Sequence, residues 1–97
     1  MDQISMTTRY RPADDVVYRT VDGEAVILSI GSGLYFGLTP VGTVIWELIE
    51  QGKALGEILA TLATEYDARE EEIERDLREL TAQLVARGLV APAADSV

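Results

Sequence analysis

The alternation of apolar and polar residues in the first third of the chain predicts β-strands. Two apolar runs, residues 16–21 and 24–30, flank the dipeptide Asp22-Gly23. A two-residue turn between such runs needs positive φ at both central positions, which favours Asp-Gly, so the pattern predicts a hairpin. In the second run the twofold period of an extended chain separates the side chains onto two faces. One face carries Val26, Leu28 and Ile30, and the other carries Ala25, Ile27 and Ser29.

The stretch GSGLYFGL, residues 31–38, predicts a second reversal followed by a third strand. Residues 31–33 are turn residues, and residues 34–38 are apolar or aromatic, with neither a charge nor a proline. Because both connections are short, we expect the strands to lie in the order one-two-three, which leaves the third at an edge. Proteins usually protect such an edge with lysine, proline or a bulge. We therefore expect either another part of the chain or a partner to cover it.

Two interpretations of residues 34–38 remain open from the residues alone. In the first, Leu34, Phe36 and Leu38 alternate into the core, while Tyr35 lies on the sheet and has no further role. In the second, an extended peptide adds itself as a fourth strand at this edge. Its affinity would come from backbone hydrogen bonds, and its specificity from side-chain pockets.

After Thr39-Pro40 the spacing of apolar residues changes to that of helices. Thr39 is a favourable N-cap and Pro40 suits the first helical position, while Gly52 is placed to end this helix. A second helix follows Lys53-Ala54, which is a poor N-cap. A third is expected to begin at Asp67, paired with Glu70 as in a capping box, and to end at Gly88. The three apolar stripes are Val41, Val44, Ile45, Leu48 and Ile49; Leu55, Ile58, Leu59, Leu62 and Ala63; and Ile73, Leu77, Leu80 and Leu84.

These elements predict one α+β domain over residues 15–91, with a three-stranded antiparallel sheet followed by three helices. The 97 residues suffice for one modest core. Residues 1–14 are expected to form a flexible N-terminal arm and residues 92–97 a disordered tail. The segment GLVAP, residues 88–92, is expected to add a last packing segment.

Missing residue types exclude much chemistry. The chain has no cysteine and no histidine, which removes thiolate catalysis, the commonest general base and the commonest metal ligands. It contains no EF-hand spacing, phosphate-binding glycine loop or nucleophile elbow. We therefore expect no enzyme activity, no metal and no cofactor. The N-terminal residues lack a secretory signal, and the apolar runs are too short to span a bilayer, so a cytoplasmic location is expected.

The charge balance indicates the kind of partner. The net charge is −9, from 17 acidic and 8 basic residues, and the basic residues are scattered. Nucleic acid and anionic membranes are therefore expected to repel the chain, which favours a polypeptide partner. The three helices resemble a winged helix-turn-helix, yet the third carries many acids, which is unfavourable in a DNA groove. An acidic transcription regulator remains the alternative from another functional class.

The acidic third helix, residues 69–80, also has two interpretations. Glu71–Arg75 and Glu74–Arg78 are spaced for ion pairs on a solvated face. Alternatively, Arg69 and Asp76 form the polar rim of a groove beside the apolar stripe. Trp46 lies off the main stripe of the first helix, and we expect it to pack between helices.

In this order and spacing, SGLYFGL running into VGTVIWELI, then EI…L…EYD and the closing RGLV, resemble the PqqD-like family of RiPP recognition elements. The similarity covers about residues 15–91. It is greatest to the stand-alone members that serve lasso-peptide biosynthesis. A peptide chaperone of pyrroloquinoline-quinone biosynthesis is the alternative within this family.

The resemblance implies a winged helix-turn-helix-like fold without catalytic activity. It also implies that the leader segment of a ribosomally made precursor peptide adds as a strand beside the third strand. The domain would present the precursor to a leader peptidase or another modifying enzyme. Matched to this chain, the expected peptide-binding residues are Leu34, Tyr35, Phe36, Gly37 and Leu38 on the strand, with Arg69, Ile73, Asp76, Leu77 and Leu80 on the third helix.

Overall fold

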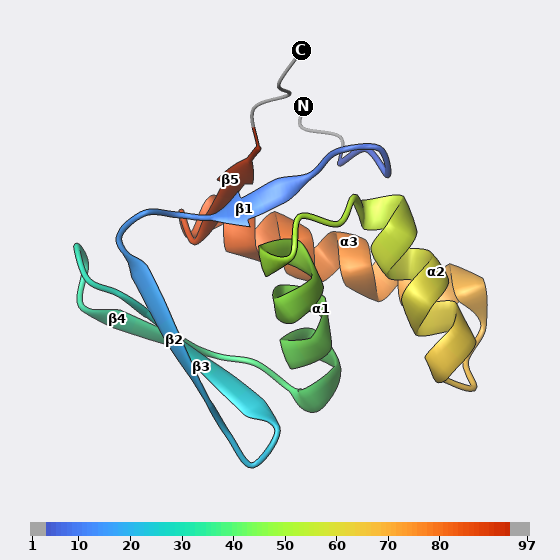
Figure 1. The fold of residues 1–97 in the computed structure, drawn as a ribbon, viewed down its shortest axis with the longest axis horizontal. Helices are drawn as coiled ribbons and strands as arrows, with labels where there is room; N and C mark the ends of the chain where they lie inside the picture. The colour runs from blue at the N-terminus through green and yellow to red at the C-terminus, as the bar shows by residue number, and fades with distance from the viewer. Residues whose placement is uncertain (1–3, 94–97) are drawn as a thin grey trace.

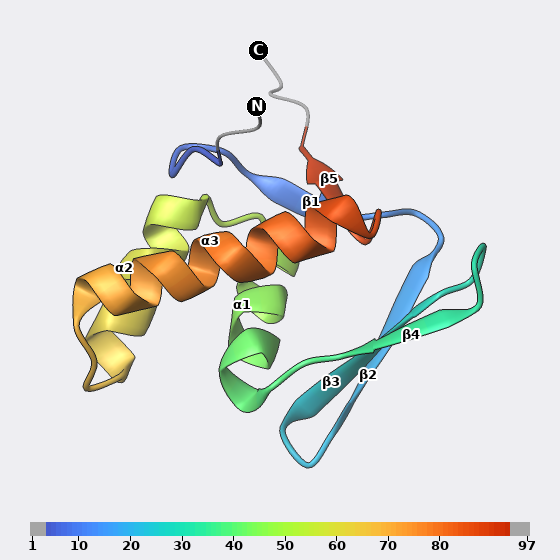
Figure 2. The ribbon, with the colours of Figure 1, turned by 180° about the vertical axis from the view of Figure 1, so that it is seen from behind.

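The computed structural model describes residues 4–93. A small three-stranded sheet lies beside three helices, and a separate pair of short strands joins the two ends of the domain (Figures 1 and 2). This confirms the predicted α+β class with three helices, while the winged-helix likeness stays a prediction. Within the described residues, no helix combines the length and the apolar character needed to cross a membrane. The elements are β1 (Tyr10–Pro12), β2 (Val16–Val21), β3 (Glu24–Ser29), β4 (Leu34–Gly37), α1 (Pro40–Glu50), α2 (Leu55–Glu65), α3 (Glu70–Ala86) and β5 (Val90–Pro92).

The three-stranded sheet is the predicted antiparallel meander, in the order β2-β3-β4. Asp22 and Gly23 have φ angles of 53° and 80°, as expected for the two-residue turn. In β3 the face that carries Ala25 and Ile27 is fully buried, whereas Val26 on the other face is 38% exposed. The sheet therefore packs through one face.

Residues 10–12 differ from the flexible arm that the sequence predicts. They form β1, which pairs antiparallel with β5, so that Tyr10 lies opposite Pro92. Hydrogen bonds also hold the preceding segment: the amide nitrogen of Gly56 donates to the Met6 carbonyl at 2.7 Å. Arg9 contacts Glu57 through Nη1 and Oε1 at 3.1 Å. Pairing between distant ends leaves no local periodicity, which is why the sequence pattern does not indicate it.

The C-terminal packing segment is confirmed. Leu89 and Val90 are each 3% exposed, and β5 extends to Pro92. Pro92 therefore belongs to a strand rather than to the expected tail, and residues 94–97 of that tail lie outside the described residues.

The helices follow the predicted stripes, with one difference at the start of α3. Thr39 caps α1, because its Oγ1 accepts from the Gly42 amide at 3.1 Å. The N-cap of α3 is Arg69, without a side-chain hydrogen bond, rather than Asp67 in a capping box. Residues 66–69 instead form the turn after α2. Three consecutive glutamates, residues 70–72, occupy the first turn of α3, where negative charge is favourable to the helix dipole.

Trp46 is fully buried, as expected of a packing residue, although its ring contact is with the sheet rather than with another helix. Its ring meets Tyr18 of β2 edge-on, with the centroids 5.6 Å apart, so it packs against the sheet. The Tyr18 hydroxyl donates to Glu50 at 2.6 Å. This hydrogen bond, aided by partial burial, raises the pKa of Tyr18 to about 12. β2 is thereby attached to the C-terminal half of α1.

Thr43 joins the sheet to α1 at the point where β4 ends. Its Oγ1 accepts from the Ala25 amide at 2.8 Å and donates to the Thr39 carbonyl at 2.9 Å. The Leu38 amide donates to the Ala25 carbonyl at 2.8 Å, so Ala25 bonds to β4 through its carbonyl and to α1 through its amide. This arrangement sets the position of β4 relative to the helices.

We predict that Thr43→Val lowers the free energy of unfolding by about 1–3 kcal/mol, because the buried Ala25 amide loses its acceptor. Denaturant unfolding followed by circular dichroism measures the change. Thr64→Val is the matched control, since the exposed Thr64 hydroxyl donates to the Ala60 carbonyl of its own helix. Equal stability losses in the two variants would contradict a special role for Thr43.

Candidate functional site

The outer edge of β4 is unpaired in the described part of the chain. β4 is the last strand of the sheet, and β3 is its single strand partner within residues 4–93. The N-terminal segment does not cover this edge, because residues 6–12 pair with β5 and the start of α2. The predicted edge position is therefore confirmed.

The strand register shows which backbone groups face this open edge. Bonded and non-bonded residue pairs alternate along an antiparallel pair of strands. The Leu38 amide donates to the Ala25 carbonyl, so Leu38 directs its backbone groups toward β3. Phe36 lies two residues earlier, opposite Ile27, and therefore also directs its amide and carbonyl toward β3. Tyr35 and Gly37 fall on the alternate positions. Their amide and carbonyl groups consequently point away from β3, toward the open edge.

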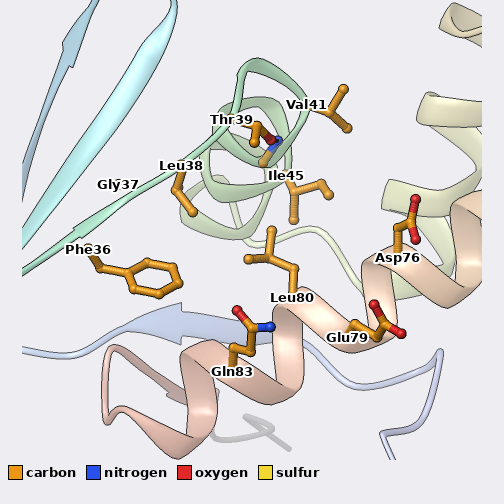
Figure 3. Close-up of a pocket in the computed structure, with 11 residues that line it drawn as sticks. Phe36, Gly37, Leu38, Thr39, Val41, Ile45, Asp76, Glu79, Leu80 and Gln83 are labelled. Atoms are coloured by element: carbon orange, nitrogen blue, oxygen red, sulfur yellow. Dashed lines mark hydrogen bonds between the residues drawn. The ribbon is translucent and has the colours of Figure 1, made fainter.

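A groove runs along this edge between β4, the start of α1 and α3. It has a volume of about 480 Å³. Phe36 and Leu38 reach it from the strand side, and Leu80 and Gln83 reach it from α3 (Figure 3). β4 and α3 run in opposite directions here, so that Phe36 lies near Gln83 while Val41 lies near Asp76. The lining residues are Phe36, Gly37, Leu38, Thr39, Val41, Gly42, Ile45, Asp76, Glu79, Leu80 and Gln83.

A second, smaller recess adjoins the groove at its Asp76 end. Its volume is about 150 Å³, and it shares Val41, Ile45 and Asp76 with the groove. The rest of its wall comes from the end of α2, the following turn and the start of α3, and is mostly apolar. These further residues are Leu62, Tyr66, Ala68 and Ile73. The groove and the recess together present apolar surface with a carboxylate at their junction.

Charged side chains lie at both ends of the groove. Asp76 and Glu79 line the end near α1. At the other end the guanidinium carbon of Arg87 lies 4.8 Å from the centroid of the Phe36 ring, which is cation–π geometry. Of the two predicted ion pairs on α3, Glu74–Arg78 forms at 2.9 Å, whereas Arg75 lies nearest Asp76, at 3.7 Å.

The structure brings together most of the sequence-predicted site residues. Phe36, Gly37, Leu38, Asp76 and Leu80 line the groove, and Ile73 lines the recess. Four others do not line either cavity. Leu34 and Tyr35 are 66% and 72% exposed beyond the groove, Leu77 is fully buried beneath it, and Arg69 lies at the N-cap of α3.

Several groove residues are not among the predicted ones. Glu79 and Gln83 follow Asp76 and Leu80 at helical spacing, so the face of α3 could have indicated them. Val41 and Ile45 belong to the apolar stripe of α1, and this pattern does not distinguish a groove wall from a core position. Arg87 follows the last turn of α3, and its contact with Phe36 depends on the tertiary fold.

Within residues 4–93, no group of three or more acidic side chains is arranged to hold a metal ion. The groove instead combines an apolar floor, a charged rim and a free strand edge. These are the features of a binding site for an extended peptide.

Comparison with known proteins agrees with this geometry. Residues 24–90 match the family model described as coenzyme PQQ synthesis protein D, PqqD. The chain belongs to the PqqD family. This confirms the sequence-based resemblance to PqqD-like RiPP recognition elements. No curated protein sequence matches the chain significantly.

Two solved structures share the fold of this PqqD-family chain. The first is described as TbiB1 in complex with the TbiA(beta) leader peptide. It has a TM-score of 0.81 and 39% identity, and the alignment covers 88% of this chain and 99% of that chain. The second is described as lasso peptide synthetase B1 complexed with the leader peptide. Its TM-score is 0.80 at 24% identity, and the alignment covers 87% of this chain and 99% of that chain.

We predict different effects for the two neighbouring leucines of α3. Leu77→Ala should lower the free energy of unfolding by about 2–5 kcal/mol, because Leu77 is fully buried. Leu80→Ala should cost clearly less, since Leu80 is part-exposed in the groove wall. Denaturant unfolding of both variants checks the order. A larger loss for Leu80→Ala would contradict the assignment of Leu77 to the core.

Proposed function

We propose that this protein binds the leader segment of a ribosomally made precursor peptide, and that the leader adds as a fourth strand beside β4. The observation that carries the proposal is the unpaired edge of β4 above an apolar groove. The 39% identical relative, described as a complex with a leader peptide, supports it.

Backbone pairing would supply much of the affinity. Tyr35 and Gly37 direct two amides and two carbonyls toward the open edge, enough for a short ladder with an extended guest. Each such hydrogen bond contributes about 0.5–1.5 kcal/mol net. Ordering a flexible leader costs part of this energy, so we expect moderate affinity.

Side chains in the groove would set the register. Successive residues of an added strand point to opposite faces, so every second guest side chain would enter the space between β4 and α3. A shift by one residue would exchange the inward and outward sets. The apolar surface of Phe36, Leu38 and Leu80 therefore favours one register of a leader with alternating apolar residues.

The proposed role is non-catalytic presentation of the precursor, in lasso-peptide maturation. β4 has four residues, so a leader longer than this leaves flanking chain outside the groove for a leader peptidase or another modifying enzyme. Docking of the domain on that enzyme would raise the local concentration of the precursor. Because the precursor is made by ribosomes, we place this encounter in the cytoplasm.

A second candidate is a peptide chaperone of pyrroloquinoline-quinone biosynthesis. The matching family model is described as coenzyme PQQ synthesis protein D, which favours this alternative. The two functions would use the same groove and differ in the partner enzyme. A pull-down that recovers a radical enzyme of that pathway, rather than a leader peptidase, would favour the second.

We predict that Gly37→Pro weakens leader binding about tenfold, because it removes an amide that faces the open edge. Fluorescence anisotropy with the labelled TbiA(beta) leader peptide measures the affinity. Gly37→Ala is the matched control: it keeps the amide, and an added Cβ meets nothing within 4 Å. Tyr35→Asp should also weaken binding, because it places a charge and a poor strand former at the edge. Unchanged affinity in both Gly37→Pro and Tyr35→Asp would exclude the β4 edge.

Methylation of backbone nitrogens along the leader provides a second test. If the leader pairs with β4, methylated positions should alternate between weakened and unchanged affinity over the paired segment, because alternate amides face the strand. The same anisotropy assay reads this series. Uniform effects along the paired segment would indicate that the leader does not bind as a strand.

A further inference from the structure

The groove is acidic at one end, and at the other end a basic side chain, Arg87, contacts the lining residue Phe36. Of its 11 lining residues, two are acidic, Asp76 and Glu79, and none is basic. Both acids lie at the end near Val41. The guanidinium of Arg87, the residue after the last turn of α3, contacts the Phe36 ring at the other end. The groove is therefore polarised along the direction that an added strand would take.

These charges are at most weakly compensated within residues 4–93. Glu79 and Arg87 form no ion pair there. Asp76 has a long contact with Arg75, at 3.7 Å between two side chains that are each about two-thirds exposed. Arg75 lies in a depression of α3 that adjoins the groove and shares Glu79 with it, but Arg75 itself does not line the groove. A guest charge would meet weak competition at both ends.

The spacing of these charges defines a distance in the guest. A helix rises about 1.5 Å per residue, so the backbones of Asp76 and Arg87 lie about 16 Å apart along α3, and those of Glu79 and Arg87 about 12 Å. An extended strand rises about 3.3 Å per residue. The two complementary guest residues should therefore be about four positions apart, an even number, because alternate side chains face the groove.

We propose that the groove selects peptides that carry a basic residue at the position facing Asp76 and Glu79, and an acidic residue about four positions away, facing Arg87. This inference rests on the proposed function, since it assigns a charge preference to the same groove. The apolar wall between the ends holds the guest, while the charges determine its direction and register. In antiparallel pairing with β4 the basic residue would precede the acidic one, and in parallel pairing it would follow.

A surface-display library of random dodecapeptides, sorted with labelled wild-type protein, tests the preference without knowledge of the natural precursor. We expect the sorted pool to be enriched in Lys or Arg at one position and in Asp or Glu about four positions away. Sorting with Asp76→Asn/Glu79→Gln should remove the basic preference and keep the acidic one. Sorting with Arg87→Gln should remove the acidic preference and keep the basic one.

Matched variants control for the overall charge. Glu24→Gln/Glu71→Gln removes two exposed acids outside the groove, and Arg19→Gln removes an exposed base of β2. These variants should select the same pool as wild type. For one selected peptide, replacing its basic residue by Met should weaken binding about two- to fivefold in wild type. The same replacement should have no effect in Asp76→Asn/Glu79→Gln.

The possible outcomes distinguish a failure of the charge preference from a failure of the proposed strand addition. Apolar peptides that bind wild type and lose affinity in Gly37→Pro, but show no charge preference, would overturn the inference and leave strand addition intact. A charge preference that the control variants abolish equally would also overturn it, because the net charge would then be responsible. Failure to select any peptide sensitive to Gly37→Pro would overturn both.

Discussion

The edge of β4, which has no strand partner on its outer side within residues 4–93, is the constraint on which the rest of the site depends. A strand edge with free amides and carbonyls is unfavourable unless water, another strand or a partner satisfies it. Here the short turn after β3 prevents β4 from reaching any other strand of the sheet. The N-terminal segment is held elsewhere by β5 and α2. Within residues 4–93 the edge therefore stays open beside the groove, and under the proposed function its backbone groups would bond to an extended guest.

The groove has a definite shape because several contacts hold the sheet against α1, the start of which lines the groove. Thr43 bonds to the end of the sheet, and Trp46 packs against Tyr18. Leu77 lies in the core beneath the groove while Leu80, one turn away, lines it. Core and site thus share α1 and α3, so a substitution on these helices can alter binding through position as well as through contact.

Charge acts at two levels in this protein. The overall excess of acids disfavours nucleic acid as a partner. Within the groove, the positions of Asp76, Glu79 and Arg87 matter more than the total, because nearby charges act over a few ångströms and distant ones are screened. The proposed selection of a peptide by the order of its charges is therefore compatible with a strongly negative net charge.

Local sequence patterns determined most of the elements and one half of the site. The Asp22-Gly23 turn, the uncharged third strand and the helical stripes follow from backbone preferences and from the periods of strands and helices, which act between neighbouring residues. SGLYFGL running into VGTVIWELI, followed by EI…L…EYD and RGLV, also indicated the family through their order and spacing. Phe36 and Leu38 were therefore predictable as site residues from their strand and its likeness to that family.

Only the tertiary structure decided which surfaces meet. The pairing of β1 with β5 joins distant segments, and the contact of Arg87 with Phe36 depends on where the end of α3 lies relative to β4. The periodicity of α3 shows an apolar face, but the packing geometry assigns Leu77 to the core and Leu80 to the groove. Such assignments depend on contacts between residues that are far apart in the sequence. A local pattern carries no information about which of these residues meet in space.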